Sequence, residues 1–230
     1  DIIIYCENTH SYEKVSFGTT LLQLSGRICP EGTDTGVQVL AALVDNKLKY
    51  LDYKIIAPHN IRFIGYDHPD GRRTYIRSLC FVLQKVVREM FPDKVLVIDY
   101  SLPSGLYCEI REVRTMEDGR PCVYFVTDDE IEAIEARMRA AIASDLPFGK
   151  TMMSLEECCR IFERQHQTEK VNLMKTIGRF NYSVYTLDGC VDTFYGPLVP
   201  STGVLSIFSL MGFNDGFCLQ YPLEGDFSEV

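Results

Sequence analysis

Histidine and cysteine, the side chains of this sequence best suited to metal binding, are dispersed along the chain. The four histidines are His10, His59, His68 and His166, and no two of them stand at the spacing of a metal-binding pair. The nine cysteines include no Cys-x-x-Cys pair. A catalytic zinc takes three protein ligands with nitrogen, sulfur or oxygen donors, so we predict no bound metal. An odd number of dispersed thiols also predicts a reducing, cytoplasmic setting without disulfides.

One segment comes close to a phosphate-binding loop. Residues 144–151, SDLPFGKT, differ by one residue from the pattern G-x-x-x-x-G-K-[ST]. Such a loop lies between a strand and a helix, where its backbone N–H groups surround the phosphate. Here a predicted helix precedes the segment, Ser144 replaces the first glycine, and Pro147 removes one N–H donor. We therefore expect a helix end and linker rather than a phosphate site.

A long helix is the clearest element in the sequence. Apolar residues recur at helical spacing from Ile76 to Met90, which predicts a helix over 74–91. The opposite face carries Arg77, Phe81, Gln84 and Arg88. A phenylalanine exposed to solvent is unfavourable. We expect either that another element covers Phe81 or that this face lines a cleft.

The other patterns are typical of an α+β protein. Capping boxes at Thr127-x-x-Glu130 and Ser154-x-x-Glu157 predict helices to about 144 and 165, and a short helix is expected from Leu21. Strands are predicted at 2–6, 12–15, 37–51 (two strands), 61–66, 95–99, 106–113 and 122–126, and beyond 165 only strands and turns are predicted. No βαβ unit with a glycine fingerprint is present, so we expect antiparallel sheets. The turn formers of 66–71 suggest a domain boundary.

Charge and composition limit the function classes. The chain has 230 residues, with 23 Lys and Arg against 32 Asp and Glu, a net charge of −9. This balance argues against a general nucleic-acid binder, which needs a basic face. Arginines at 72, 73 and 77 leave a local RNA contact open. No apolar run is long enough for a membrane helix, and we expect no membrane association.

Several stretches resemble parts of threonyl-tRNA synthetases. FGTTLLQL (17–24) and VLAALVDNKLKYLDYKI (39–55) resemble a TGS domain, a small ubiquitin-like module. VVREMFPD (86–93), PSGLYCEI (103–110), VTDDEIEAIEARM (126–138), DLPF (145–148) and GPLVPSTG (196–203) resemble the second additional domain, which edits mischarged serine. The likeness covers nearly the whole chain. It implies a TGS-like domain at 1–66 and an editing-type domain at 67–230, with an antiparallel sheet and a long central helix.

The resemblance also implies where the site would lie. The family's editing site uses His-x-x-x-His on the long helix and Cys-x-x-x-His before the PSTG turn. These positions fall on Arg77, Phe81, Phe194 and Leu198. A guanidinium and three hydrocarbon side chains cannot act as a general base, so we expect no catalytic residues among them. We expect a cleft where Phe81, Phe194 and Leu198 meet. Either they fill it, or Arg77 binds a small anionic or nucleotide-like ligand at its rim.

The degenerate site favours one function over two others. It suits the bacterial uridine or nucleoside kinase-like proteins, in which a synthetase-like region precedes a P-loop kinase of the phosphoribulokinase class. The chain would then be their non-catalytic regulatory or ligand-binding region. It would hold no cofactor, and ATP and Mg would belong to a kinase domain beyond Val230. The alternative is a threonyl-tRNA synthetase-related editing domain or freestanding deacylase. A dimerisation scaffold is the third interpretation, and it leaves a homo-oligomer open.

Overall fold

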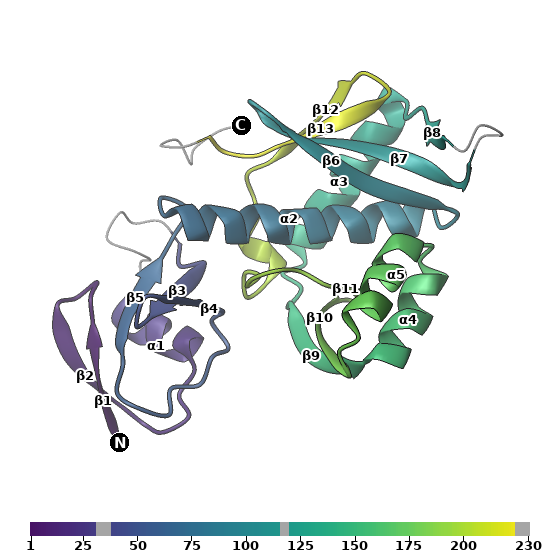
Figure 1. The fold of residues 1–230 in the computed structure, drawn as a ribbon. Coiled ribbons are helices and arrows are strands. Elements are labelled where there is room, and N and C mark those ends of the chain that lie inside the picture. The colour runs from purple at the N-terminus through teal and green to yellow at the C-terminus, as the bar shows by residue number, and fades with distance from the viewer. Residues whose placement is uncertain (31–37, 116–119, 224–230) are drawn as a thin grey trace. The chain divides into compact units, whose positions relative to one another are not determined.

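The computed structural model describes residues 1–30, 38–115 and 120–223. The chain divides into two units, each made of several segments (Figure 1). The first contains 1–79, 145–148 and 194–205, and the second contains 80–144, 149–193 and 206–230. The domain boundary predicted between Tyr66 and Asp67 implies that the two parts fold independently, and it stays a prediction. Among the described residues, no helix is both long and apolar enough to cross a membrane.

The first unit contains a five-stranded sheet that packs with a short helix, α1 (Leu21–Ile28). The strands are β1 (Ile2–Cys6), β2 (Ser11–Val15), β3 (Ala41–Val44), β4 (Lys47–Lys49) and β5 (Asn60–Ile64), in the order β2-β1-β5-β3-β4. Only β1 and β5 pair in parallel. Helix α1 begins at a capping box between Thr20 and Gln23. Its buried Leu21 and Leu24 join a core of residues that all lie between Ile4 and Phe63.

The long helix α2 (Pro69–Met90) begins five residues earlier than predicted. Proline is well placed in the first turn of a helix, because the N–H that it lacks has no intrahelical partner there. Gly71 belongs to the same turn, where a Cβ atom would lie 1.8 Å from the carbonyl oxygen of Gly65. The turn formers of 66–71 therefore include the start of the helix, and the close approach to Gly65 requires glycine.

The second unit has a large antiparallel sheet. It contains β6 (Lys94–Leu102), β7 (Gly105–Thr115), β12 (Ser209–Phe213) and β13 (Gly216–Gln220), in the order β12-β13-β7-β6, and β8 (Pro121–Tyr124) pairs with β7. Helix α3 (Asp128–Ala143) is joined to β12 by Glu135, whose carboxylate accepts a hydrogen bond from the amide of Leu210 at 2.7 Å. The turn predicted at Asp118-Gly119 lies outside the described residues.

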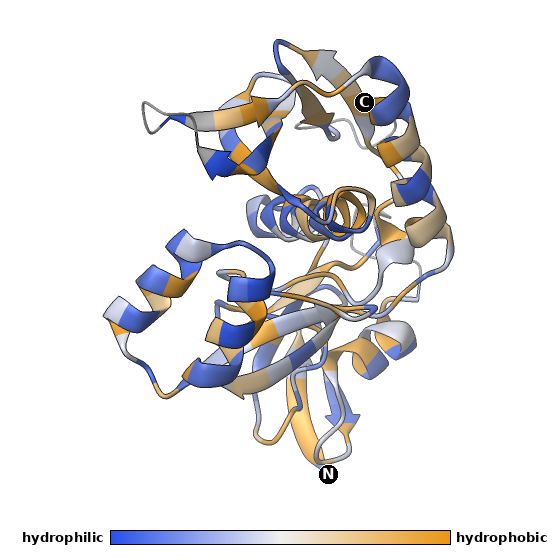
Figure 2. Ribbon diagram, turned by 90° about the vertical axis from the view of Figure 1, so that its right-hand side faces the viewer, coloured by the Kyte–Doolittle hydropathy of each residue, from blue (hydrophilic) through white to orange (hydrophobic). Residues whose placement is uncertain are grey.

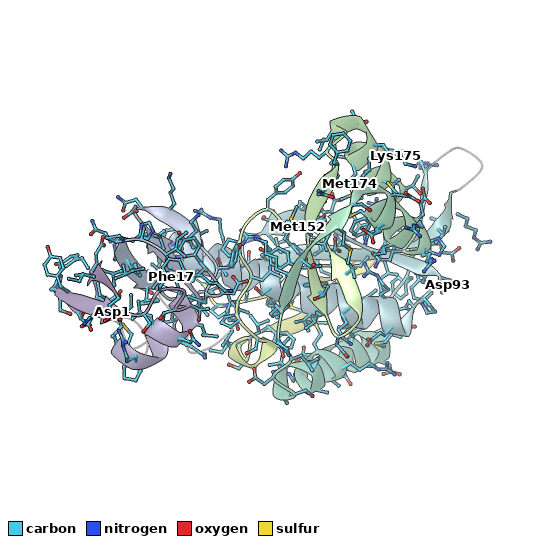
Figure 3. The ribbon with its side chains drawn as sticks, turned by 90° about the horizontal axis from the view of Figure 1, so that it is seen from below. Asp1, Phe17, Asp93, Met152, Met174 and Lys175 are labelled. Carbon is cyan, nitrogen blue, oxygen red and sulfur yellow. The ribbon has the colours of Figure 1, made fainter. Side chains whose placement is uncertain are left out.

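A smaller sheet in the same unit packs against two helices. Strands β9 (Gly149–Ser154), β10 (Asn181–Leu187) and β11 (Cys190–Asp192) run in the order β11-β10-β9. Helices α4 (Leu155–Arg164) and α5 (Thr168–Ile177) supply Phe162 and Met174 to a shared core with Val184 of β10. Both helices alternate apolar and polar residues (Figure 2). On α5, buried Met174 is followed by exposed Lys175 (Figure 3). These sheets and helices confirm the predicted α+β class.

Two predictions about elements were wrong, and the helix end and linker predicted at 144–151 holds only in part, since α3 does end with its C-cap at Ser144. Helix α5 was not predicted, because its N-cap residue Gln167 makes no side-chain capping bond. Residues 204–210 were predicted as a strand, but a 3₁₀ turn ends at Val204 and β12 begins only at Ser209. The phosphate-loop-like segment ends in strand β9, where a Cβ on Gly149 would lie 2.4 Å from Oγ1 of Thr186. Gly149 therefore allows the close approach of Thr186 on the paired strand β10, and it does not precede a helix as the second glycine of a phosphate loop does.

Candidate functional site

Two consecutive residues of α2 hold the loop that precedes the PSTG turn. Arg77 donates a hydrogen bond from Nη1 to the carbonyl oxygen of Pro197. Ser78 accepts a hydrogen bond at its Oγ from the amide of Val199 at 2.9 Å. These contacts join residues about 120 positions apart in the chain. The helix face that was predicted to carry the site therefore does contact the segment at 197–199.

Gly196 completes this contact. Its φ is +113°, in the region where residues with a side chain are strained. A Cβ on Gly196 would also lie 3.0 Å from three atoms of the Arg77 guanidinium. The guanidinium therefore packs against the glycine backbone while it binds the next carbonyl group. This arrangement gives Arg77 a role in holding the loop.

The other three predicted site residues are mostly removed from solvent. Phe81 is 0 % exposed and Leu198 is 3 % exposed, and Phe194 is half-buried. Phe81 is therefore not exposed to solvent. Of the two alternatives given for it above, the first applies, because neighbouring atoms cover its ring. Arg77, Phe194 and Leu198 belong to the first unit, and Phe81 belongs to the second. A shared cleft and an anion at Arg77 stay predictions.

The other side of the same loop is fixed by residues 145–148. Leu146 and Thr202 are joined by two hydrogen bonds of 2.9 Å. The Leu146 amide donates to the Thr202 hydroxyl, and the Thr202 amide donates to the Leu146 carbonyl. The Asp145 carboxylate accepts a hydrogen bond from the amide of Gly203 at 3.0 Å. The two stretches DLPF and GPLVPSTG, which carry part of the family resemblance, are therefore hydrogen-bonded partners. Backbone and side-chain hydrogen bonds from residues 145 and 146 therefore hold the PSTG turn.

A buried carboxylate in the second unit was not recognised in the sequence. Asp192 is 0 % exposed, and its Oδ1 accepts hydrogen bonds from Lys170 and from the amide of Thr193. Its Oδ2 lies 3.8 Å from Nη2 of Arg88 and has no hydrogen-bond partner among the described residues. A carboxylate in the apolar run CVDTF was the sequence signal that could have revealed it. The cluster places two cations around one buried anion.

Arg88 also contacts a thiol. Its Nη1 donates to Sγ of Cys190 at 2.7 Å. Burial raises the pKa of the Cys190 thiol, although the neighbouring Arg88 charge opposes this effect. The same helix carries buried Lys85, which pairs with Glu89 and Asp188. Burial alone would lower the pKa of Lys85, but its hydrogen bonds to the two carboxylates outweigh burial and raise that pKa. Lys85 therefore keeps its positive charge.

No metal centre is evident in the part of the chain that the structure describes, where no three His, Cys, Asp or Glu side chains form a group suited to one. Two histidines have polar partners. His59 contacts the Asp45 carboxylate at 2.6 Å, and His68 accepts a hydrogen bond from the amide of Asp70 at 3.1 Å. All nine cysteines are free thiols. The prediction of no bound metal remains for elemental analysis to test.

Comparison with known proteins finds similarity to threonine–tRNA ligases. No family model matches the chain. It is 29% identical over 180 residues to threonine–tRNA ligase of Acidithiobacillus ferrooxidans, covering 78% of this chain and 26% of that protein. It is 27% identical over 175 residues to the ligase of Carboxydothermus hydrogenoformans, covering 76% and 26%, and 27% identical over 202 residues to that of Desulforamulus reducens, covering 87% and 30%. The chain spans about a quarter to a third of the length of these curated relatives.

These similarities correct the functional interpretation. The chain is related to threonyl-tRNA synthetases over most of its length. The interpretation as the regulatory region of a uridine kinase-like protein is wrong, because the similar proteins are threonine–tRNA ligases. That interpretation rested on the missing donors at four positions. The loss of catalytic donors shows what chemistry is absent from those positions, but it does not identify a kinase.

Proposed function

We propose that this chain is an editing-type module, related to that of threonyl-tRNA synthetases, that binds the aminoacylated 3′ end of a tRNA. The observation that carries the proposal is the contact between α2 and the loop at 197–199. Arg77 and Ser78 hold that loop through Pro197 and Val199. The two segments that supply the site in the resembling family are thus tied together here. A cytoplasmic location, where aminoacyl-tRNA is found, belongs to the same proposal.

The four family positions provide no hydrolytic chemistry in this proposal. Hydrolysis of the aminoacyl ester needs a group that takes a proton from the attacking water. A positioned general base typically contributes about 10²–10⁴-fold to such a rate. Arg77 carries a permanent positive charge, and Phe81, Phe194 and Leu198 have no polar side-chain atom. We therefore expect binding without deacylation through these residues.

A deacylase that uses a different base is the second candidate. The observation that favours it is Asp192, a buried carboxylate whose Oδ2 has no hydrogen-bond partner among the described residues. A carboxylate oxygen can accept a proton from water, and Lys170 and Arg88 would stabilise the negative charge nearby. In this case activity would depend on Asp192 and not on Arg77.

One experiment separates the two candidates. A threonine-specific tRNA that carries serine is mixed with the protein. Binding is measured by fluorescence anisotropy, and hydrolysis of the ester is measured by the release of labelled serine. We expect saturable binding and a hydrolysis rate equal to that without protein. The net charge of −9 should make the binding weak, because it repels the phosphates of the tRNA.

The control variants are Asp192→Asn and Arg77→Ala. Hydrolysis that Asp192→Asn abolishes would favour the deacylase over the binding module. Hydrolysis that Arg77→Ala abolishes would show that the four positions do carry chemistry. Absence of binding at low salt would contradict both candidates.

A further inference from the structure

A groove in the second unit lies between α4 and the turn that joins α5 to β10 (Figure 1). Its volume is about 610 Å³, and all of its lining residues belong to the segment 149–193. The less exposed part of the lining includes Cys159, which is buried, and Leu155, which is half-buried. The groove therefore offers an apolar floor to a side chain from outside.

Phe180 stands at the edge of this groove with its ring in solvent. Its exposed fraction is 91%, higher than that of any other large apolar residue that the structure describes. Its backbone is fixed, because its carbonyl accepts a hydrogen bond from the amide of Leu155 at 2.9 Å and Gly178 closes α5 in the left-handed region. Single exposed apolar residues are common on protein surfaces. This one differs, because an apolar groove lies directly beside it.

The rim of the groove carries charges of both signs. The Arg160 guanidinium lies 3.9 Å from the Glu156 carboxylate. The Lys175 ammonium lies 3.2 Å from the Glu163 carboxylate. All four side chains are more than half exposed, so these pairs are weak and can exchange partners. Arg179, also exposed, brings the lining to three cations and two carboxylates. The groove is therefore locally positive in a chain whose net charge is −9, which reduces the repulsion between two copies that meet there.

We propose that this surface is an interface between two copies of the chain, in which the Phe180 ring of each copy fills the groove of the other. The ring and the groove lie on the same surface, and the ring stays exposed in a single chain. A two-fold axis brings each of them against its counterpart in the second copy. The cations of one rim can then face the carboxylates of the other, which gives charge complementarity without any further partner. Aromatic residues and arginine are also enriched at such interfaces.

Single-stranded RNA is a second class of partner that uses exposed aromatic rings, because its bases stack on them beside cations. The two carboxylates of the rim and the apolar floor oppose the phosphate backbone, which favours a continuously basic surface. The surface therefore fits a second copy better than RNA. The interface is independent of the proposed tRNA function, because neither Arg77 nor Asp192 lines the groove.

Sedimentation equilibrium of the whole chain tests the proposal. We expect the average mass to rise from one chain to two as the protein concentration increases from about 1 μM to about 1 mM, the range in which small interfaces dissociate. Phe180→Ser removes the ring and should weaken the association by about tenfold or more. Phe17→Ser is the matched control, because Phe17 is 72% exposed and lies in the first unit, and it should leave the association unchanged.

A charge reversal tests the rim separately. Arg179→Glu changes the lining to two cations and three carboxylates and should also weaken the association. Arg137→Glu makes the same change in net charge at an exposed position of α3. It should have little effect at moderate salt, where charges far from the interface are screened.

Three results would overturn the proposal. The first is a chain that stays monomeric at about 1 mM. The second is an association that Phe180→Ser weakens no more than Phe17→Ser does, which would place the contact on another surface. The third is saturable binding of oligouridylate that Phe180→Ser abolishes, which would assign the surface to RNA. If Phe180→Ser fails to fold, the two arginine variants decide the question, and equal association in both then contradicts the interface.

Discussion

At the scale of single residues, two of the positions at which a site was predicted have structural roles. Arg77 donates a hydrogen bond to the loop at Pro197, and Phe81 is completely buried. From the sequence alone, the residue types at the four predicted positions indicate which chemistry their side chains cannot provide. The sequence could not show that Arg77 would bind a main-chain carbonyl, because that partner carries no side-chain signature. Asp192 was missed for a different reason. Its side chain is visible in the sequence, but a single carboxylate in a strand usually faces solvent, so its burial was not expected.

The contact between Arg77 and Gly196 predicts a measurable coupling. Gly196→Ala and Gly189→Ala both place alanine at a positive φ, of 113° and 78° respectively. Only the Cβ at Gly196 would approach another group, the Arg77 guanidinium at 3.0 Å, while nothing lies within 4 Å of the Cβ at Gly189. Each change should lower the free energy of unfolding by about 1 kcal/mol through backbone strain. Gly196→Ala should lose roughly 1 kcal/mol more through crowding.

Urea denaturation of the single and double variants measures this coupling. In the Arg77→Ala background, the two alanine substitutions should become equal in their effect, because the crowding partner is gone. An excess loss at Gly196 that persists without Arg77 would show that the contact is not the cause.

At the scale of elements, the sequence predicted those that carry local signals. The helix at α2 follows from its apolar period, and α3 and α4 follow from capping boxes that the structure confirms. Helix α5 has no such cap, and its boundary is set by the αL residue Gly178 and by packing of Met174 into the shared core. Strand β9 exists because it pairs with β10. Elements that depend on tertiary partners leave little trace in a single sequence.

Strand β7 predicts a pH dependence of stability. Tyr107 is buried on this strand, and burial together with the nearby Glu109 charge raises its pKa to about 12. The unfolded chain would ionise this tyrosine near pH 10, so the folded state holds the proton more tightly. Stability from this residue is fully present below about pH 10 and is lost as pH rises toward 12. The two-unit difference corresponds to about 2–3 kcal/mol.

Denaturation between pH 8 and pH 12 measures this loss. The slope of unfolding free energy against pH should be shallower in Tyr107→Phe, which has no ionisable hydroxyl. Tyr12→Phe is the matched control, because it removes the same hydroxyl from a side chain that is 77% exposed. Identical slopes in wild type and Tyr107→Phe would contradict the prediction.

At the scale of the whole molecule, the proposed TGS-like region has its own core. Every member of the cluster from Ile4 to Phe63 lies within residues 1–66. We therefore predict that a fragment of residues 1–66 folds cooperatively. A domain of this size buries only about 60% of its unfolded surface, so its stability should be a few kcal/mol. Circular dichroism with urea measures the transition, and a non-cooperative or absent transition would place the boundary elsewhere.

The long-range tie between α2 and the loop at 197–199 has a consequence for synthesis on the ribosome. The described residues of the first core lie between Ile4 and Phe63, so that core can close as soon as the chain has left the exit tunnel to this point. The bonds of Arg77 and Ser78 reach 120 and 121 residues further along. At about 5–20 residues per second, translation delays these bonds by roughly 6–24 seconds. During that interval the nascent chain carries a finished N-terminal module beside a helix whose arginine still lacks its Pro197 partner.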